Sequence, residues 1–274
     1  MTETSSRERG TRGGDGGSDP TPILELAGVH VTIGGSHILQ GVDATVRRGG
    51  VTALLGRNGV GKTTTVKAVL GLVPSTGSIV FDGERIDGRP THAVVRRGVG
   101  YVPEDREVFS SLTVEENLKL AEPRAGQPDY DRAFTLFPDL YQRRKQRAGT
   151  LSGGQQQMLA LARVLLGPTE LLLVDEPTKG LAPLIVAQVG DALATVAEHT
   201  TVLLVEQNLP LVRRIADDAI VVDTGRVVHS CPAADLLGDE DLVNALLGVA
   251  GTRSDHAAPT PTAANQAVPK GSSR

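Results

Sequence analysis

The chain has 274 residues, with 28 Lys and Arg against 32 Asp and Glu, which gives a formal net charge of −4 at pH 7. This balance argues against a protein that binds nucleic acid by neutralising phosphates. Hydrophobic residues make up 39% but aromatic residues only 3%, with no Trp, which favours aliphatic parallel strands and covering helices over a β-sandwich or barrel. The single cysteine, Cys231, excludes an internal disulfide framework.

Both ends of the chain have a composition typical of disorder. Residues 1–22 are rich in Gly and polar residues, and residues 251–274 are rich in Ala, Pro, Thr and Ser, so we predict two disordered tails around a folded domain over 23–250. No apolar run approaches the about 18 residues of a membrane span, and residues 1–20 lack the apolar stretch of a secretory signal. We therefore expect a cytoplasmic protein without a membrane-spanning segment of its own.

Four short apolar runs predict strands of one sheet. They are 51–55, 171–174, 202–205 and 219–222, and helical patterns separate them. Runs of this kind, without alternation of polar residues, are typical of parallel strands buried on both faces. We predict an α/β fold with a mainly parallel sheet.

A glycine-rich segment follows the first of these runs and matches the pattern GxxxxGK[ST]. In this pattern glycines let backbone N–H groups curl around phosphate oxygens at the start of a helix, here expected to run to Leu70. Lys62 would reach the terminal phosphates, and the Thr63 hydroxyl would ligate Mg²⁺. The predicted nucleotide-binding residues of this loop are Gly56, Arg57, Asn58, Gly59, Val60, Gly61, Lys62, Thr63 and Thr64.

Residues 102–165 differ in pattern and predict a helical insert in the sheet domain. A charged loop, Pro103–Phe109, is followed by a capping-box pattern from Thr113 to Glu116, which predicts a helix to about Ala121. A basic segment over 143–147 follows, which we interpret as a solvated helix face.

Within the insert lies the segment Leu151-Ser152-Gly153-Gly154-Gln155. Ser152 is placed to cap a helix over about 155–166, and the two glycines leave their N–H groups approachable. The segment therefore predicts a second anion-binding helix end.

The strand at 171–174 ends in Asp175 and Glu176. Parallel strands of an α/β sheet bind ligands at their carboxyl ends, so we expect both carboxylates beside the glycine-rich loop. Asp175 would hold Mg²⁺ through a water molecule, and Glu176 would orient and deprotonate the attacking water in phosphoryl transfer.

These three motifs, in this order over 23–250, resemble the ATP-binding subunit of an ABC transporter. The resemblance implies a P-loop NTPase (RecA-like) core with an N-terminal antiparallel β part and the inserted helical subdomain, with ATP and Mg²⁺ as ligands. It implies a second ATPase subunit, because each ATP would lie between one subunit's P-loop and the other's Leu151–Gln155 segment. It also implies a groove at Pro103–Phe109 for a transmembrane permease subunit, at the cytoplasmic face of the membrane.

Further segments are similar to the second ATPase subunit (LivF type) of branched-chain amino-acid importers. They are 102–104 with 112–118, 176–183 and 205–208. This similarity implies an importer for branched-chain or related small amino acids, indirectly served by an extracytoplasmic binding protein. A urea or amide importer, or an exporter or drug-resistance system, remains an alternative because the ATP site is shared.

Four positions depart from the general ABC pattern. Gln207 stands where a switch histidine usually contacts the γ-phosphate, and Glu104 replaces a glutamine near Mg²⁺, where it could coordinate the metal. Both recur in LivF-type subunits, although they leave open a largely regulatory subunit with slow turnover. Ala182 replaces an aspartate between the two sites, and Ile33 lies where an aromatic side chain should stack on adenine, which predicts weak base selectivity.

Overall fold

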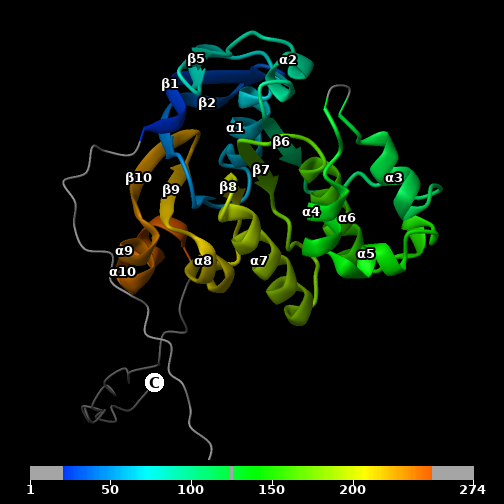
Figure 1. Cartoon of the computed structure of the whole chain (residues 1–274). Helices are drawn as coiled ribbons and strands as arrows, with labels where there is room; N and C mark the ends of the chain where they lie inside the picture. Colours follow the sequence, from blue (N-terminus) through cyan, green and yellow to red (C-terminus); the bar gives the residue numbers. More distant parts are fainter. Residues whose placement is uncertain (1–20, 124–125, 249–274) are drawn as a thin grey trace, which may run out of the picture.

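The computed structural model describes residues 21–123 and 126–248 (Figure 1). Residues 1–20 of the predicted tail 1–22 and the whole predicted tail 251–274 lie outside these residues, and Pro22, placed in the first tail by the prediction, already begins the first strand. The boundaries 23–250 of the folded domain stay a prediction. The strands are β1 (Pro22–Ile33), β2 (Ser36–Arg47), β3 (Val51–Leu55), β4 (Thr76–Phe81), β5 (Glu84–Arg85), β6 (Val99–Val102), β7 (Leu171–Asp175), β8 (Thr201–Val205), β9 (Asp218–Asp223) and β10 (Arg226–Pro232).

The helices follow the predicted alternation with strands. They are α1 (Lys62–Val69), α2 (Thr91–Val95), α3 (Val114–Leu120), α4 (Tyr130–Leu136), α5 (Pro138–Gln142), η1 (Ala148–Thr150), α6 (Gly153–Leu165), α7 (Pro183–Ala197), α8 (Leu209–Ile215), α9 (Ala233–Gly238) and α10 (Glu240–Leu247). Within the described part of the chain, none of them combines the length and the apolar character of a bilayer-spanning segment.

The described strands form two sheets. The smaller is antiparallel, in the order β2-β1-β4-β5, and the larger has the order β10-β9-β3-β8-β7-β6. In the larger sheet, β9, β3, β8, β7 and β6 run parallel and β10 pairs antiparallel with β9. All four strands predicted from apolar runs are present. The predicted α/β class, with a mainly parallel sheet and an N-terminal antiparallel part, is confirmed.

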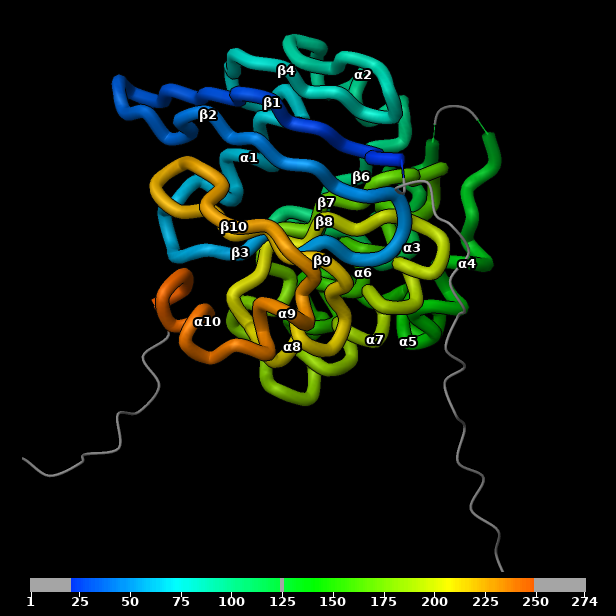
Figure 2. Tube along the Cα trace, turned by 90° about the vertical axis from the view of Figure 1, so that its left-hand side faces the viewer, coloured from blue at the N-terminus to red at the C-terminus, as the bar shows by residue number. Residues whose placement is uncertain are grey.

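The central strands of the larger sheet, β3, β7 and β8, are buried on both faces. In both views α1 lies between the two sheets (Figure 1, Figure 2), and Val66 on this helix packs with Leu171 and Leu173 of β7 in one apolar cluster. The alternate residues, Leu172 and Val174, pack in a second cluster with α6 and α7 on the opposite face. Because both faces are covered, every position of β7 is apolar until Asp175, and each fully buried Leu contributes about 1.5–3 kcal/mol.

The helices α3 to α6 fall between β6 and β7 in the chain and gather beside the larger sheet (Figure 1). Thr113 caps α3 through the predicted capping box with Glu116, with both reciprocal hydrogen bonds present. Buried Phe137 and Leu140 join this region to the cluster around α6 and α7. The extent of the helical insert as a unit, 102–165, stays a prediction.

The packing of α6 on α7 depends on a residue without a side chain. A Cβ atom added at Gly154 would lie 2.2 Å from Ile185 Cγ2, on the first turn of α7. At the preceding residue, Gly153, the nearest atoms would be 3.3 Å away and belong to the flexible ends of Arg106 and Leu181.

We expect Gly154→Ala to lower the free energy of unfolding by about 1–3 kcal/mol, because the added methyl group overpacks the α6–α7 contact. Urea denaturation followed by circular dichroism measures this change. Gly153→Ala is the matched control and should not destabilise the protein. In an Ile185→Ala background the loss at Gly154 should disappear; equal stability of the two single glycine variants would contradict the prediction.

Candidate functional site

The glycine-rich loop connects β3 to α1, as its pattern predicts, and two of its glycines are required by their surroundings. Gly56 has φ 146°, and a Cβ atom there would lie 2.2 Å from the carbonyl oxygen of Val222. Gly61 has φ 112°, and its Cβ atom would lie 2.7 Å from Leu39 Cδ2. Side chains are therefore excluded where the loop turns and where it enters α1.

The Lys62 ammonium lies inside this loop. Its Nζ donates hydrogen bonds to the carbonyl oxygens of Gly56, at 2.8 Å, and Arg57, at 2.9 Å, and only 5% of its side chain is exposed. Nζ also lies 3.9 Å from Glu176 Oε1. Burial lowers the pKa of Lys62, against the opposing effect of the Glu176 carboxylate. The loop thus holds a cation whose hydration has been removed, which is the group that a polyphosphate would contact.

Asp175 lies at the carboxyl end of β7 and is fully buried. Its Oδ1 accepts a hydrogen bond from the Thr63 hydroxyl at 3.1 Å, and its Oδ2 is buried without a hydrogen-bond partner in the described structure. Burial raises the pKa of Asp175.

These two residues fit a Mg²⁺ ion bound jointly by protein and phosphate. Within residues 21–123 and 126–248 no group of three or more His, Cys, Asp or Glu is arranged to hold a metal. Mg²⁺, however, is usually bound through one or two carboxylates together with phosphate oxygens and water. The Thr63 hydroxyl and the unpartnered Oδ2 of Asp175 are the ligands that the protein would contribute to such an ion.

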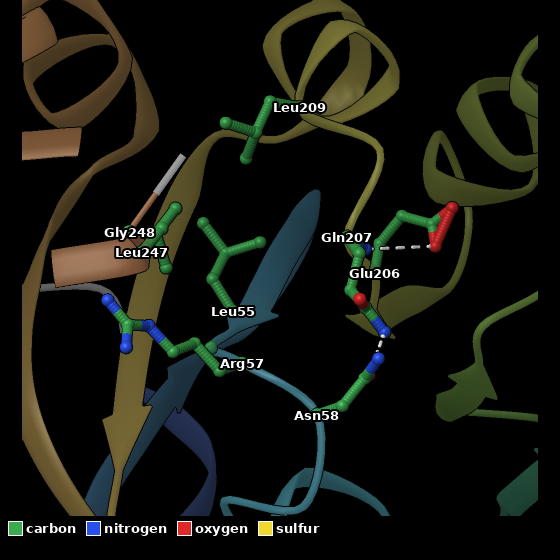
Figure 3. A pocket seen from close by; sticks show the side chains of 9 residues that line it. Leu55, Arg57, Asn58, Glu206, Gln207, Leu209, Leu247 and Gly248 are labelled. Carbon is green, nitrogen blue, oxygen red and sulfur yellow. Dashed lines mark hydrogen bonds between the residues drawn. The ribbon is translucent and has the colours of Figure 1, made fainter. Parts of the chain in front are cut away.

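Glu176 follows directly, with a backbone conformation uncommon for a residue with a side chain. Its φ is 43°, and its N–H donates to the carbonyl of Val205 at 2.9 Å. Its Oε1 accepts a hydrogen bond from Gln207 Nε2. The same Nε2 also donates to Asn58 Oδ1 at 2.6 Å (Figure 3). Gln207 therefore connects the glycine-rich loop to Glu176. The positive φ of Glu176 is a strained backbone conformation, and such strain is typical of functional positions.

A cavity of about 420 Å³ opens beside the loop (Figure 3). It is lined by loop residues, by the segment after β8 and by the end of α10: Leu55, Gly56, Arg57, Asn58, Glu206, Gln207, Leu209, Leu247 and Gly248. Ile33 is not among these residues. It ends β1 beside the turn to β2, with 48% of its surface exposed.

Glu104 lies near these acidic groups, but its carboxylate is already paired. Its Oε1 is 2.5 Å from Lys179 Nζ, and the same Nζ lies 3.6 Å from Glu176 Oε2. The sequence reasoning did not identify Lys179, although a lysine three residues after Glu176, on the turn that leaves β7, was a visible signal. It also missed Glu206, which is buried, accepts a hydrogen bond from the Thr178 hydroxyl and has its pKa raised by burial.

The Leu151–Gln155 segment starts α6. Ser152 is the N-cap, and the cap is reciprocal: Ser152 Oγ accepts from the Gln155 N–H at 3.3 Å, and Gln155 Oε1 accepts from the Ser152 N–H at 3.0 Å. The helix begins at Gly153, two residues before the predicted start. Leu151 is buried in the cluster around α6 and α7. No hydrogen bond or ion pair among the described residues joins this segment directly to the loop that holds Lys62.

The loop Pro103–Phe109 borders a small hollow of about 170 Å³. Tyr101, Arg106 and Arg163 contribute to its lining, and the Arg163 guanidinium lies 5.1 Å from the centre of the half-exposed Phe109 ring. Arg106 and Glu107 both have positive φ, 62° and 45°. Two neighbouring residues with side chains in this conformation cost about 1–3 kcal/mol each.

Comparison with known proteins assigns this chain to a family. Residues 39–179 match the model of the ABC transporter family. The chain is 40% identical over 232 residues to the high-affinity branched-chain amino acid transport ATP-binding protein BraG of Pseudomonas aeruginosa, covering 82% of this chain and 100% of BraG. It is 37% identical over 220 residues to the probable branched-chain amino acid transport ATP-binding protein LivF of Archaeoglobus fulgidus, covering 78% of this chain and 93% of LivF.

A solved structure agrees with these relatives. The cbiO1 protein from Clostridium perfringens, part of the ABC transporter complex cbiONQ, superposes with a TM-score of 0.71 at 27% identity, covering 83% of this chain and 96% of cbiO1. The resemblance drawn from the motifs is confirmed. The chain belongs to the ABC transporter family as one of its ATP-hydrolysing, nucleotide-binding subunits.

Proposed function

We propose that the glycine-rich loop over residues 56–64, called the P-loop from here on, and the carboxyl ends of β7 and β8 form the ATP-hydrolysing site of this chain. The observation that supports this most directly is the convergence of Lys62, Asp175 and Glu176. The Lys62 ammonium lies 3.9 Å from Glu176 Oε1, and Asp175 contacts the Thr63 hydroxyl of the same loop. Residues 56–64 would surround the phosphates of ATP, with Lys62 reaching the terminal ones.

Thr63 and Asp175 would hold Mg²⁺, with Glu104 as a further candidate close by. The ion, when bound, neutralises charge on the phosphates. Glu176 is the general base that orients a water molecule and accepts its proton. Gln207 holds Glu176 Oε1 through its amide, and an amide cannot carry a proton as a histidine would.

The capped end of α6, Leu151–Gln155, serves the ATP of a second ATPase subunit. Ser152 and the following glycines present a helix amino end, where N–H groups and the helix dipole favour an anion. In this arrangement one chain provides two halves of two different sites. A homo- or heterodimer completes both.

The chain drives an importer for branched-chain or related small amino acids. The names of its two most informative relatives, BraG and LivF, support this substrate class. A permease subunit would dock at the Pro103–Phe109 loop and hold the chain at the cytoplasmic face of the membrane. An extracytoplasmic binding protein would deliver the substrate.

Substitution of the base and of the phosphate-binding lysine tests the ATP site. With the partner ATPase present, Glu176→Gln should reduce phosphate release at least about 100-fold and leave the affinity for Mg-ATP within about threefold, because it removes only the proton acceptor. Lys62→Ala should weaken ATP binding itself by about tenfold or more. Unchanged turnover in Glu176→Gln would show that this chain's own site is idle and that the subunit is regulatory.

Base selectivity is expected to be weak because Ile33 offers no ring for stacking on a purine. ATP and GTP should bind with dissociation constants within about tenfold of each other, and Ile33→Tyr should tighten ATP binding by about 1–3 kcal/mol. Calorimetry with both nucleotides measures this, with Ile33→Leu as the apolar control. A preference for ATP above about tenfold in the unchanged protein would contradict the expectation.

Uptake measurements test the transported substrate. Cells that carry Glu176→Gln in place of the natural residue should take up labelled leucine at least about tenfold more slowly than the parent, because hydrolysis no longer resets the dimer. Uptake of labelled urea should not change. Loss of urea uptake with intact leucine uptake would favour the alternative importer class, and a defect in neither would favour an exporter.

A further inference from the structure

Lys179 makes contacts that neither the P-loop nor the base requires. It lies on the turn after β7, with 60% of its side chain exposed. Its Nζ is 2.5 Å from Glu104 Oε1 and 3.6 Å from Glu176 Oε2. The hydrogen bond with Glu104, together with the charges of Glu104 and Glu176, raises the pKa of Lys179. One ammonium group thus connects the loop that follows β6 to the base that follows β7.

The Glu176 carboxylate is consequently held at both oxygens. Gln207 Nε2 donates to Oε1, and Lys179 Nζ lies beside Oε2. Lys62 also approaches Oε1, at 3.9 Å, but its hydrogen bonds go to the loop carbonyls. A general base must be oriented within a few tenths of an ångström of its productive position. Among the ion pairs of the described residues, the one that reaches Oε2 is that of Lys179.

Lys179 is itself held by the Pro103–Phe109 loop at two points. Glu104 contacts its ammonium, and Arg106 Nη2 donates a hydrogen bond to its backbone carbonyl at 3.3 Å. Arg106 and Glu107 have the positive φ angles already described. The position of Lys179 therefore depends on a strained loop, which contacts both the side chain and the backbone of this lysine.

We propose that Lys179 is a positioning residue for ATP hydrolysis, which holds Oε2 of Glu176 and is kept in place by Glu104. The inference rests on the proposed role of Glu176 as the base. An ion pair as exposed as that between Lys179 and Glu104 contributes little to stability, so its removal should affect turnover and leave folding intact.

Steady-state ATP hydrolysis by the full chain with its partner ATPase tests this role. Lys179→Met should reduce kcat by about tenfold, with KM for ATP within about twofold and an unchanged melting temperature, because orientation of the base is lost but the P-loop is intact. Lys179→Arg, which keeps the charge, should retain at least about half of kcat. Lys119→Met is the matched control, because Lys119 has 59% exposure and pairs with Glu115 on α3, away from the site.

Exchanging the charges of Glu104 and Lys179 distinguishes a positioning role of Lys179 from a surface ion pair that has no role in turnover. Glu104→Lys combined with Lys179→Glu restores a pair of opposite charges but places a carboxylate beside Glu176, so kcat should stay about tenfold low or fall further. Glu104→Gln should lower kcat less in the Lys179→Met background than in the unchanged protein, because the lysine that Glu104 holds in place is gone.

Three results would overturn the inference. They are a kcat of Lys179→Met within about twofold of the unchanged protein, full activity of the exchanged pair, or an equal loss in Lys119→Met. Glu176→Gln, assayed in parallel, tells the two proposals apart. If Glu176→Gln is inactive while Lys179→Met is normal, only the role of Lys179 fails; if Glu176→Gln is fully active, the proposed base fails and the role of Lys179 fails with it.

Discussion

The parallel pairing of β3, β8 and β7 is the constraint on which the site depends. Val51 to Leu54 pair with Val202 to Val205, and Leu171 to Asp175 pair with Thr201 to Val205. Three chain segments far apart in sequence therefore leave the sheet at one edge. The P-loop, the acidic pair and Gln207 follow these three strands. Their proximity is thus a consequence of backbone hydrogen bonding between apolar strands, with α1 and α7 covering the two faces.

Charge at this edge is arranged in two layers. The inner layer is the buried Lys62 ammonium among the carboxylates of Asp175, Glu176 and Glu206, where burial lowers the pKa of the lysine and raises the pKa values of Asp175 and Glu206. Removing water makes each of these interactions stronger than it would be on the surface. The outer layer is exposed, and Lys179 occupies it together with Glu104. A polyphosphate with Mg²⁺ would add both signs of charge to the inner layer.

The motifs were recognisable from the sequence because each of them acts through the backbone of one short segment. Gly56 to Thr63 join β3 to α1 through a loop with positive φ at its glycines, and Ser152 caps the helix that begins at the next residue. The strand 171–175 was recognisable because a strand covered on both faces must be apolar at successive positions. The α/β class and most of the residues proposed for the site followed from these local rules.

The partners of the charged side chains depended on the tertiary structure. Glu104 was expected near a metal, and it lies against Lys179, which is 75 residues away in the chain. Gln207 contacts Asn58 and Glu176, across 149 and 31 residues. Local composition carries no information about which long side chain meets which, since that is decided by the order of strands in the sheet and by the path of the loops between them. The motifs were written in the sequence, whereas the network that joins them exists only once β6, β7, β8 and β3 lie side by side.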